Sequence, residues 1–230
     1  MDDRTRRAEA AIEKSDIVVG YSRYLHLIRD LTQGKRLVSS GMTREVDRCR
    51  EAIRLAREGS TVSLVSSGDA GVYGMAGLAL EIVAQDGLEL DVEIVPGVTA
   101  ALAAAAKLGA PLMLDFCVIS LSDLLAPWSV IRERLMAVAQ ADFVTALYNP
   151  RSVRRIKQLD EAANIFLKFR KGNTTVGIVT STGTEKETVV ISDLDHFLEH
   201  DINMLSVVII GSSSSRVMNG RFVTPRGYKI

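Results

Sequence analysis

The stretch that decides the fold runs Ser66-Ser67-Gly68-Asp69-Ala70-Gly71-Val72-Tyr73-Gly74-Met75-Ala76-Gly77. It follows the apolar, β-branched run 61–65 and opens a segment with helical periodicity at 74–84. The pattern therefore predicts a strand-to-helix loop at the carboxyl end of a sheet strand. Open α/β sheets bind their ligands at such ends.

The composition of this loop indicates what it can bind. Gly68, Gly71 and Gly74 permit positive φ and carry no side chain, so the backbone can approach a ligand closely. Asp69 can cap the loop or accept hydrogen bonds from a sugar hydroxyl. A tight turn with an N-cap would have the same composition. Because the Lys-Ser/Thr of a P-loop and the second glycine run of a dinucleotide fingerprint are absent, a ligand without phosphate is favoured.

Length and composition indicate a globular protein with one large domain or two small ones. The 230 residues are 47% hydrophobic, which suffices for a large core. No apolar run approaches the roughly 20 residues that a membrane helix needs, and Met1–Arg4 is too polar to begin a signal peptide. We therefore expect a cytoplasmic protein without a membrane partner.

Charge and cysteine content exclude further classes of function. Lysine and arginine total 28, as do aspartate and glutamate, so no net charge directs the chain to nucleic acid. Cys49 and Cys117 lack metal-site spacing, and the three histidines do not supply it. We expect two reduced thiols and no metal site.

Hydrophobic periodicity predicts strands that alternate with helices. The expected strands are 16–20, 36–39, 61–65, 92–95, 117–120, 143–148, 175–180, 188–191 and 206–210. The expected helices are 5–14, 24–31, 43–58, 74–85, 101–108, 128–140 and 153–169, the third with Thr43 as its N-cap and Gly59 as its stop. We predict two α/β domains, 1–114 with a mostly parallel sheet and 115–230 with a mixed sheet.

Five segments can be compared as a set: 16–21 with Tyr24, 66–77, Pro-Gly-Val-Thr-Ala at 96–100, 119–125 with Pro127-Trp128, and Tyr-Asn-Pro-Arg-Ser at 148–152 with Arg155. Together they resemble the tetrapyrrole methylases, which transfer a methyl group from S-adenosylmethionine to corrin precursors. The segments 66–77 and 148–152 resemble the precorrin-3B C17-methyltransferase group in particular.

This resemblance implies two α/β domains with a cleft between them, a homodimer, and S-adenosylhomocysteine as the product of the donor. The substrate partner would be a corrin precursor methylated at C17 with ring contraction. Donor contacts would come from strand-end residues: Gly68, Asp69, Ala70, Val72, Tyr73, Thr99, Ala100, Tyr148, Val208 and Ile209.

Methyl transfer from a sulfonium is an in-line displacement that needs little acid–base help. Alignment of donor and acceptor can contribute on the order of 7–11 kcal/mol, so a backbone-lined pocket is expected rather than a catalytic triad. Asp123 and Tyr148 are the only candidates for a catalytic residue. Asp123 also suits a helix N-cap.

A corrin precursor carries several carboxylates, which guanidinium groups bind well. Three arginines, Arg151, Arg154 and Arg155, fall in the expected first turn of a helix. The helix dipole disfavours cations there, so a role in ligand binding is favoured over a helix whose first turn happens to be basic. The substrate-binding candidates are Tyr21, Tyr24, Ser122, Asn149, Arg151 and Arg155. Packing in the core is the alternative for Tyr21, Tyr24 and Trp128.

Members of the family usually begin with a strand and a Gly-x-Gly-Pro-Gly loop just before the segment matched by 5–8. This sequence begins at Met1, so either the start is drawn too late or that first strand is absent. We expect such a chain to bind S-adenosylhomocysteine and to methylate poorly. A sibling enzyme acting at another carbon and a ligand-binding α/β protein without turnover remain alternatives, and substrates with or without cobalt both fit.

Overall fold

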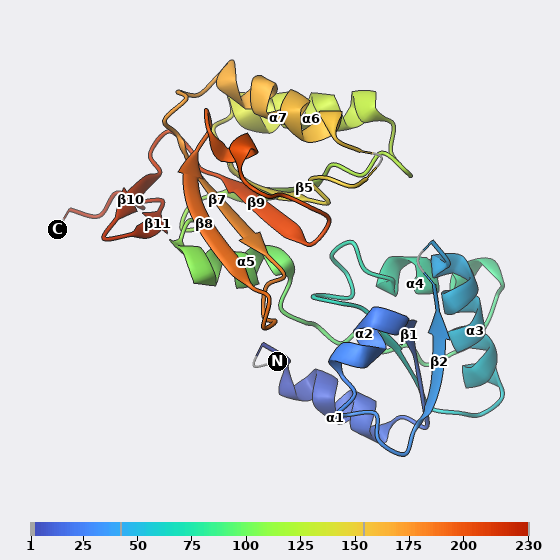
Figure 1. Ribbon diagram of the computed structural model, residues 1–230. Coiled ribbons are helices and arrows are strands. Elements are labelled where there is room, and N and C mark those ends of the chain that lie inside the picture. Colours follow the sequence, from blue (N-terminus) through green and yellow to red (C-terminus); the bar gives the residue numbers. More distant parts are fainter. Residues whose placement is uncertain (1–2, 42, 154, 230) are drawn as a thin grey trace. The chain divides into compact units, whose positions relative to one another are not determined.

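The computed structural model describes residues 3–41, 43–153 and 155–229. The chain forms two compact units, Met1–Thr99 and Ala100–Ile230 (Figure 1). The division falls before helix α5 (Ala100–Leu108), because this helix contacts strands of the second unit. The boundary expected at residue 114 would have assigned α5 to the first domain.

The first unit is built on a parallel sheet of three strands in the order β2-β1-β3. Its elements are α1 (Arg6–Lys14), β1 (Ile17–Tyr21), α2 (Ser22–Leu27), β2 (Arg36–Ser40), α3 (Glu45–Arg57), β3 (Val62–Val65) and α4 (Ala76–Gln85). The parallel arrangement and the alternation of strands with helices confirm the predicted fold class for this part of the chain.

Strand β1 shows why helices cover both faces of this sheet. Ile17 and Val19 pack with Leu55 of α3, whereas Val18 points the other way and packs with Leu25 of α2. Successive side chains of a strand alternate between faces, so a strand that is apolar throughout must be buried on both sides.

Of the four helices that the structure describes in this unit, only α1 has a side-chain hydrogen bond at its N-cap. The Thr5 hydroxyl accepts the Ala8 N–H at 3.2 Å and caps α1, and Gly59, at φ 92°, ends α3 as predicted. The prediction of Thr43 as the N-cap of α3 is wrong. Thr43 has φ 62°, and the cap position is held by Arg44, which makes no side-chain capping bond.

Two further predictions for this unit need correction. Helix α2 ends at Leu27, and turns replace the expected last helical turn up to residue 31. Residues 92–95 form no strand, since they pair with no described strand, and Val92 and Ile94 are 38% and 41% exposed. An apolar, β-branched segment forms a strand only where a neighbouring strand supplies hydrogen-bond partners for its backbone.

The second unit contains a mixed sheet of five strands in the order β5-β6-β9-β7-β8. Its elements are α5, β4 (Gly109–Ala110), β5 (Phe116–Ser120), α6 (Trp128–Gln140), β6 (Val144–Tyr148), α7 (Lys157–Leu167), β7 (Thr175–Thr180), β8 (Thr188–Asp193), the 3-10 turn Phe197–Glu199, β9 (Ser206–Ile210), β10 (Arg216–Met218) and β11 (Arg221–Val223). Only the β5–β6 pair is parallel, which confirms the predicted mixed sheet.

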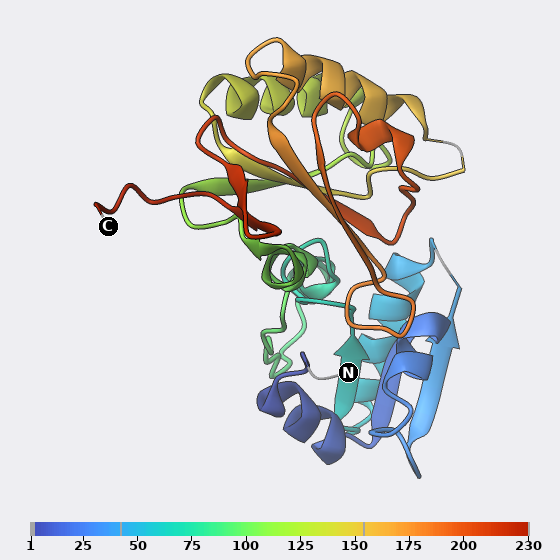
Figure 2. The ribbon, with the colours of Figure 1, turned by 60° about the vertical axis from the view of Figure 1, so that its left-hand side comes forward.

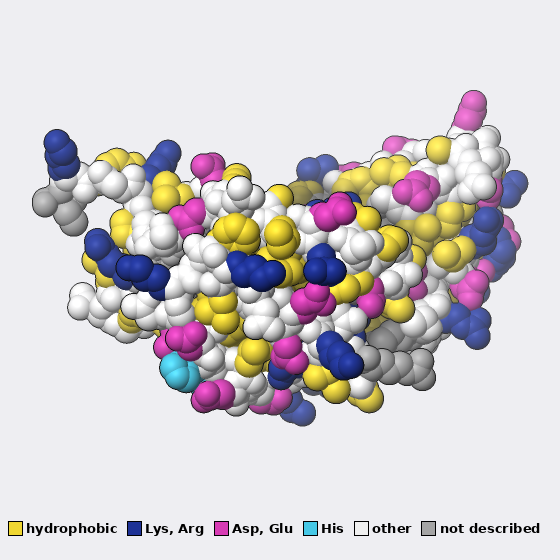
Figure 3. All heavy atoms as spheres, turned by 90° about the horizontal axis from the view of Figure 1, so that it is seen from above, with side chains coloured by type: hydrophobic (Ala, Val, Ile, Leu, Met, Phe, Trp, Pro, Cys, Tyr) yellow, Lys and Arg dark blue, Asp and Glu magenta, His cyan; other side chains and the backbone are white. Residues whose placement is uncertain are grey.

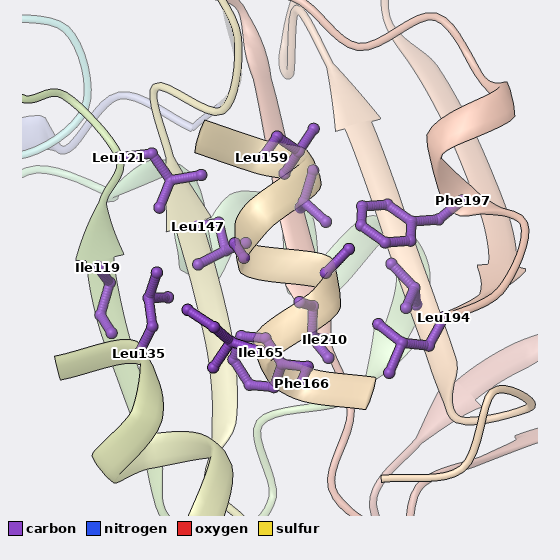
Figure 4. Close-up of a cluster of buried hydrophobic side chains, with 14 of the residues drawn as sticks. Ile119, Leu121, Leu135, Leu147, Leu159, Ile165, Phe166, Leu194, Phe197 and Ile210 are labelled. Carbon is purple, nitrogen blue, oxygen red and sulfur yellow. The ribbon is translucent and has the colours of Figure 1, made fainter. Parts of the chain in front are cut away.

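Helices cover both faces of this sheet (Figures 1 and 2). Helices α6 and α7 lie on one face over the largest core cluster, in which Leu135 and Phe166 meet Leu147 and Ile210 (Figure 4). Helix α5 packs on the opposite face, where its alanines allow close contact with β7 and β9. The small sheet β10-β11-β4 was not predicted, because its strands are two or three residues long.

The surface carries no large area of one charge on the face drawn in Figure 3, where acidic and basic side chains are interspersed. Within the described residues, no helix is long and apolar enough to cross a membrane. The same part of the chain holds no group of three or more histidine, cysteine, aspartate or glutamate residues that could bind a metal ion.

Candidate functional site

The glycine-rich loop follows β3 and is held together by Asp69. One carboxylate oxygen of Asp69 accepts the Gly71 N–H at 2.8 Å, and the other accepts the Gly97 N–H at 2.9 Å. The first bond closes a turn within the loop, and the second ties it to the Pro-Gly-Val-Thr-Ala loop. Asp69 therefore holds the loop after β3 to the segment before α5, which the sequence did not reveal.

Two glycines allow these loops to pack backbone on backbone. A Cβ at Gly97 would overlap the Gly68 carbonyl, and a Cβ at Gly74 would overlap the Ala70 carbonyl. Tyr73 adopts φ 53°, a left-handed conformation that is uncommon for an aromatic residue, and it is 57% exposed. The predicted donor contacts from Gly68 to Tyr73 thus lie on one tightly built loop.

Tyr21 and Tyr24 lie at the carboxyl end of β1. Their rings meet edge to face with centroids 5.2 Å apart. Burial raises the pKa of the Tyr24 phenol, and Tyr21 raises it further, while the charge of Arg48 acts in the opposite direction. Neither tyrosine is fully buried, so both can still contact a ligand.

In the second unit, Ser120 organises the ends of the parallel strands β5 and β6. Its hydroxyl accepts the side-chain amide of Asn149 at 3.0 Å and the Ser122 N–H at 3.2 Å. Asn149 has φ 51°, a conformation that asparagine tolerates well. The structure thus brings the predicted residues Ser122 and Asn149 together through Ser120, which was not among the predicted site residues.

Arg155 is 6% exposed and has no carboxylate partner among the described residues. One terminal nitrogen, Nη2, donates to the Asn149 carbonyl at 2.8 Å and to the Met204 sulfur at 3.3 Å. Its Nε is buried and has no partner in the described part of the chain. Burial lowers the pKa of this guanidinium, and the more distant charge of Asp123 raises it in part.

Arg151 differs from Arg155 because a carboxylate already neutralises it. Its Nη2 lies 2.7 Å from the Asp160 carboxylate. Helix α7 begins at Lys157 rather than at 153, so both arginines precede the helix and the predicted conflict with its dipole does not arise. Arg154 lies outside the described residues.

Asp123 does not cap a helix, which corrects one of its two predicted roles. Helix α6 begins five residues later with Pro127 in the cap position. The Asp123 carboxylate instead accepts a hydrogen bond from the Gln158 side chain at 2.9 Å and links the loop after β5 to the first turn of α7. Trp128 donates to Glu161 at 2.7 Å and packs against the core, so its role is structural.

Tyr148 ends β6 and meets the start of helix α5. Its phenol oxygen accepts the Ala101 N–H at 2.7 Å, which satisfies one of the free N–H groups of the first turn. This bond places Tyr148 beside Ala100, the first residue of α5, as two of the predicted donor contacts. Thr99 is the last residue of the first unit.

Val208 and Ile209 lie in the middle of β9. Both are 0% exposed, and their side chains point into the two core clusters on opposite faces of the sheet. Both residues also pair with β6 on one side and β7 on the other. Both side chains thus pack in the core, and their contact with the donor stays a prediction. The roles of the other candidate residues stay predictions.

Comparison with known proteins places this arrangement in a family. The chain matches the family model of the tetrapyrrole (corrin/porphyrin) methylases over residues 1–197. It is 46% identical to a probable cobalt-factor III C(17)-methyltransferase of Salmonella typhimurium, over 98% of this chain and 94% of that protein. It is 47% identical to a cobalt-factor III methyltransferase of Priestia megaterium, and this match covers 98% of this chain and 42% of the relative.

A solved structure agrees with these relatives. The crystal structure of the methyltransferase CobJ superposes with a TM-score of 0.89 at 34% identity, over 96% of this chain and 93% of that one. The chain spans less than half of the Priestia megaterium protein but nearly all of the Salmonella typhimurium protein and of CobJ. The chain belongs to the tetrapyrrole (corrin/porphyrin) methylases.

Proposed function

We propose that this protein transfers a methyl group from S-adenosylmethionine to C17 of a cobalt-factor III type macrocycle, with ring contraction. A relative that matches 98% of this chain, over 94% of its own length, is named a probable cobalt-factor III C(17)-methyltransferase. In the transfer, the bond from the methyl carbon to the sulfonium sulfur breaks as the bond to C17 forms. S-adenosylhomocysteine leaves with the electron pair of the broken bond.

The glycine-rich loop and the Pro-Gly-Val-Thr-Ala loop supply the donor-binding part of this proposal. Asp69 fixes one loop against the other, so their backbone groups are held in place before a ligand arrives. A fixed, backbone-lined site suits a reaction that depends on alignment rather than on proton transfer. No described side chain is needed as a general base for the displacement itself.

Arg155 is the single observation that carries the substrate-binding part. It is a buried cation with no carboxylate partner among the described residues, and burying an unpaired charge costs several kcal/mol. A carboxylate of the macrocycle would supply the missing partner. The bond to the Asn149 carbonyl holds the guanidinium at the carboxyl end of β6, where ligand sites of α/β sheets lie.

Exposed apolar side chains in the segments after β5 and β6 suit the flat face of a macrocycle. Leu124 and Leu125 in the loop after β5 are 78% and 101% exposed, and Val153 and Ile156 in the loop after β6 are 97% and 56% exposed. The Asp123–Gln158 hydrogen bond links the segments that carry them. Burial of such side chains against a ligand is favourable by about 25 cal/mol per Å².

The test is incubation of the purified protein with cobalt-factor III and S-adenosylmethionine carrying a ¹³C-labelled methyl group. The expected product has one labelled methyl, which NMR places at C17. Label at another carbon would instead identify a sibling enzyme. Binding of S-adenosylhomocysteine without any methylated product would favour a ligand-binding protein. The same assay with metal-free precorrin-3B shows whether cobalt is required.

We also propose that the protein is a cytoplasmic homodimer. Both cysteines are free, which fits a reducing compartment. Several apolar side chains near the short sheet of the second unit are exposed, among them Val217 at 51% and Met113 at 44%, and such residues often mark an interface. Light scattering should give twice the chain mass of 25.0 kDa, and a single-chain mass at micromolar concentration would contradict the dimer.

A further inference from the structure

Three arginines are buried among the described residues, and they differ in what surrounds their charge. Arg48 is 4% exposed, Arg155 is 6% exposed and Arg170 is 7% exposed. An arginine keeps its charge in a protein, so each buried guanidinium needs partners for five N–H donors. Among the described residues, a carboxylate lies within ion-pair distance of Arg170 but not of Arg48 or Arg155.

Arg170 has the partners of a structural residue. Asp142 lies 3.4 Å from its Nε, its terminal nitrogens donate to the carbonyls of Phe143 and Gly211, and its guanidinium lies over the Phe166 ring at 4.7 Å. These groups belong to the end of the sheet opposite the loops of the site, because Phe143 precedes β6. Arg170 thus fastens helix α7 to the sheet.

Arg48, on helix α3, lacks such compensation. Its Nε donates to the Ser40 hydroxyl at 2.8 Å, Nη2 donates to the Gly41 carbonyl at 2.8 Å, and Nη1 meets the Met75 sulfur at 3.2 Å. A thioether is a weak acceptor, and these bonds occupy only one N–H of each nitrogen. Within the described ranges, Arg48 forms no ion pair with a carboxylate.

The surroundings of Arg48 repeat those of Arg155. Each guanidinium donates to the carbonyl of the residue that directly follows a parallel strand, Gly41 after β2 and Asn149 after β6. Each also meets a methionine sulfur, at 3.2 Å and 3.3 Å. Two N–H groups of Arg48, one on Nη1 and one on Nη2, have no partner in the described part of the chain.

The position of Arg48 in the first unit is also that of a ligand site. Tyr21 of β1 pairs in register with Ser40 of β2, so the ends of both strands lie at one edge of the sheet. Helix α2 packs on one face of β1 and helix α3 on the other, so the connections after β1 and β2 leave this edge in opposite directions. Such a divergence forms the ligand crevice of open α/β sheets.

We propose that Arg48 is a carboxylate-binding residue of the first unit, which takes an anionic side chain of the tetrapyrrole through the terminal N–H groups that have no partner among the described residues. This inference rests on the proposed function for the identity of the ligand. A planar guanidinium with one N–H free on each terminal nitrogen presents two parallel donors, which match the two oxygens of a carboxylate. Neither charge patterning nor a motif marks Arg48 in the sequence, because it lies in a helix in which acidic and basic residues are interspersed, as in many exposed helices.

The test compares Arg48→Gln with wild type in binding uroporphyrin III, a stable porphyrin with eight carboxylates, followed by its absorbance. Glutamine can still bond to Ser40 or Gly41 but carries no charge. We expect uroporphyrin affinity to fall roughly ten- to a hundredfold, as for the loss of a charged hydrogen bond. Binding of a tetracationic N-methylpyridinium porphyrin should not weaken, and affinity for S-adenosylhomocysteine should stay within about twofold.

Arg50→Gln is the matched control. Arg50 lies on the same helix, is exposed, and pairs with Asp86 at 3.1 Å. It should bind uroporphyrin as wild type does. Equal affinity of Arg48→Gln and wild type for uroporphyrin would overturn the proposal. So would an equal loss of S-adenosylhomocysteine binding, because Arg48 would then only hold Met75 and its loop in place.

Two further points keep the test decisive. If Arg48→Gln does not fold, Arg48→Lys replaces it, and lysine should bind uroporphyrin more weakly than wild type because a single ammonium cannot form the paired bonds. Wild-type affinity of a folded Arg48→Lys protein would overturn the proposal. If the wild type binds uroporphyrin through Arg48 but does not methylate cobalt-factor III, the proposed function fails while this site stands.

Discussion

The carboxylate of Asp69 accepts the backbone N–H of Gly97 at 2.9 Å, and this bond joins the loop after β3 to the loop before α5. Because the other oxygen of Asp69 is occupied by the Gly71 N–H, the side chain has a structural task on both sides. The glycine-rich loop after β3 is therefore fixed by Gly97, which lies 28 residues after Asp69 in the chain.

Replacement of Asp69 should show this task directly. Asp69→Ala leaves the Gly97 N–H without its acceptor, which costs about 1–3 kcal/mol. We expect a lower melting temperature and weaker binding of S-adenosylhomocysteine, measured by calorimetry, with tetrapyrrole affinity less affected. Asp69→Asn keeps one acceptor oxygen and should be intermediate. An alanine variant with unchanged donor affinity would show that the two loops hold their shape without this bond.

Close backbone packing predicts a sharp difference between neighbouring glycines. A Cβ at Gly97 would lie 3.0 Å from the Gly68 carbonyl carbon as well as overlapping its oxygen, and neither atom can move without shifting the loop. Gly97→Ala should reduce S-adenosylhomocysteine affinity about tenfold or more, in line with the cost of overpacking.

The control for this prediction is Gly77→Ala. Gly77 lies within α4, and a Cβ there meets no atom within 4 Å. Alanine in a helix is favoured over glycine by about 0.5–1 kcal/mol, so this variant should melt slightly higher and bind the donor normally. Similar behaviour of Gly77→Ala and Gly97→Ala would contradict the packing argument.

The two described arginines beside Asn149 should contribute unequally to substrate binding. In the described part of the chain Arg155 has no carboxylate partner, whereas Arg151 is neutralised by Asp160 at 2.7 Å. Arg155→Ala should raise the KM for the tetrapyrrole roughly ten- to a hundredfold, with a smaller effect of Arg151→Ala. Affinity for S-adenosylhomocysteine is measured in parallel, and a loss of donor binding as large as the loss for the tetrapyrrole would assign Arg155 to the donor or to the fold.

Cys49 predicts an alkaline loss of stability. It is 0% exposed on helix α3, and burial raises the pKa of its thiol from 9.0 to about 11. In the unfolded chain the thiol ionises near pH 9, while the folded state keeps its proton. The protonated Cys49 thiol therefore makes its full contribution to the free energy of unfolding below pH 9. As the pH rises from 9 to about 11, the free energy of unfolding falls by about 2 kcal/mol.

Denaturant unfolding between pH 8 and about 11.5 measures this loss. Cys49→Ala is expected to be less stable at neutral pH but to show a flatter decline above pH 9, since the titrating group is gone. Tyrosines, lysines and Cys117 remain in both proteins, so the difference between the two curves isolates Cys49. Parallel curves would show that the thiol titrates equally in the folded and unfolded states.

The sequence by itself determined the order and type of most elements, because these depend on local periodicity. The apolar run before Ser66 correctly predicted a strand, and the glycines after it correctly predicted a turn. The alanines of α5 correctly predicted a closely packed helix. The prediction of a strand at 92–95 was wrong, because a strand needs a neighbouring strand to pair with and the local sequence does not specify one.

Only the tertiary structure decided which charged residues are available to a ligand. Arg151 and Arg155 look alike in the sequence, yet Asp160 neutralises the first and burial isolates the second. Arg48 lies in a helix with ordinary charge patterning and becomes a candidate only because folding buries it beside Gly41 and Met75. Charge compensation depends on distance in space and on removal from water, and neither can be obtained from spacing along the chain.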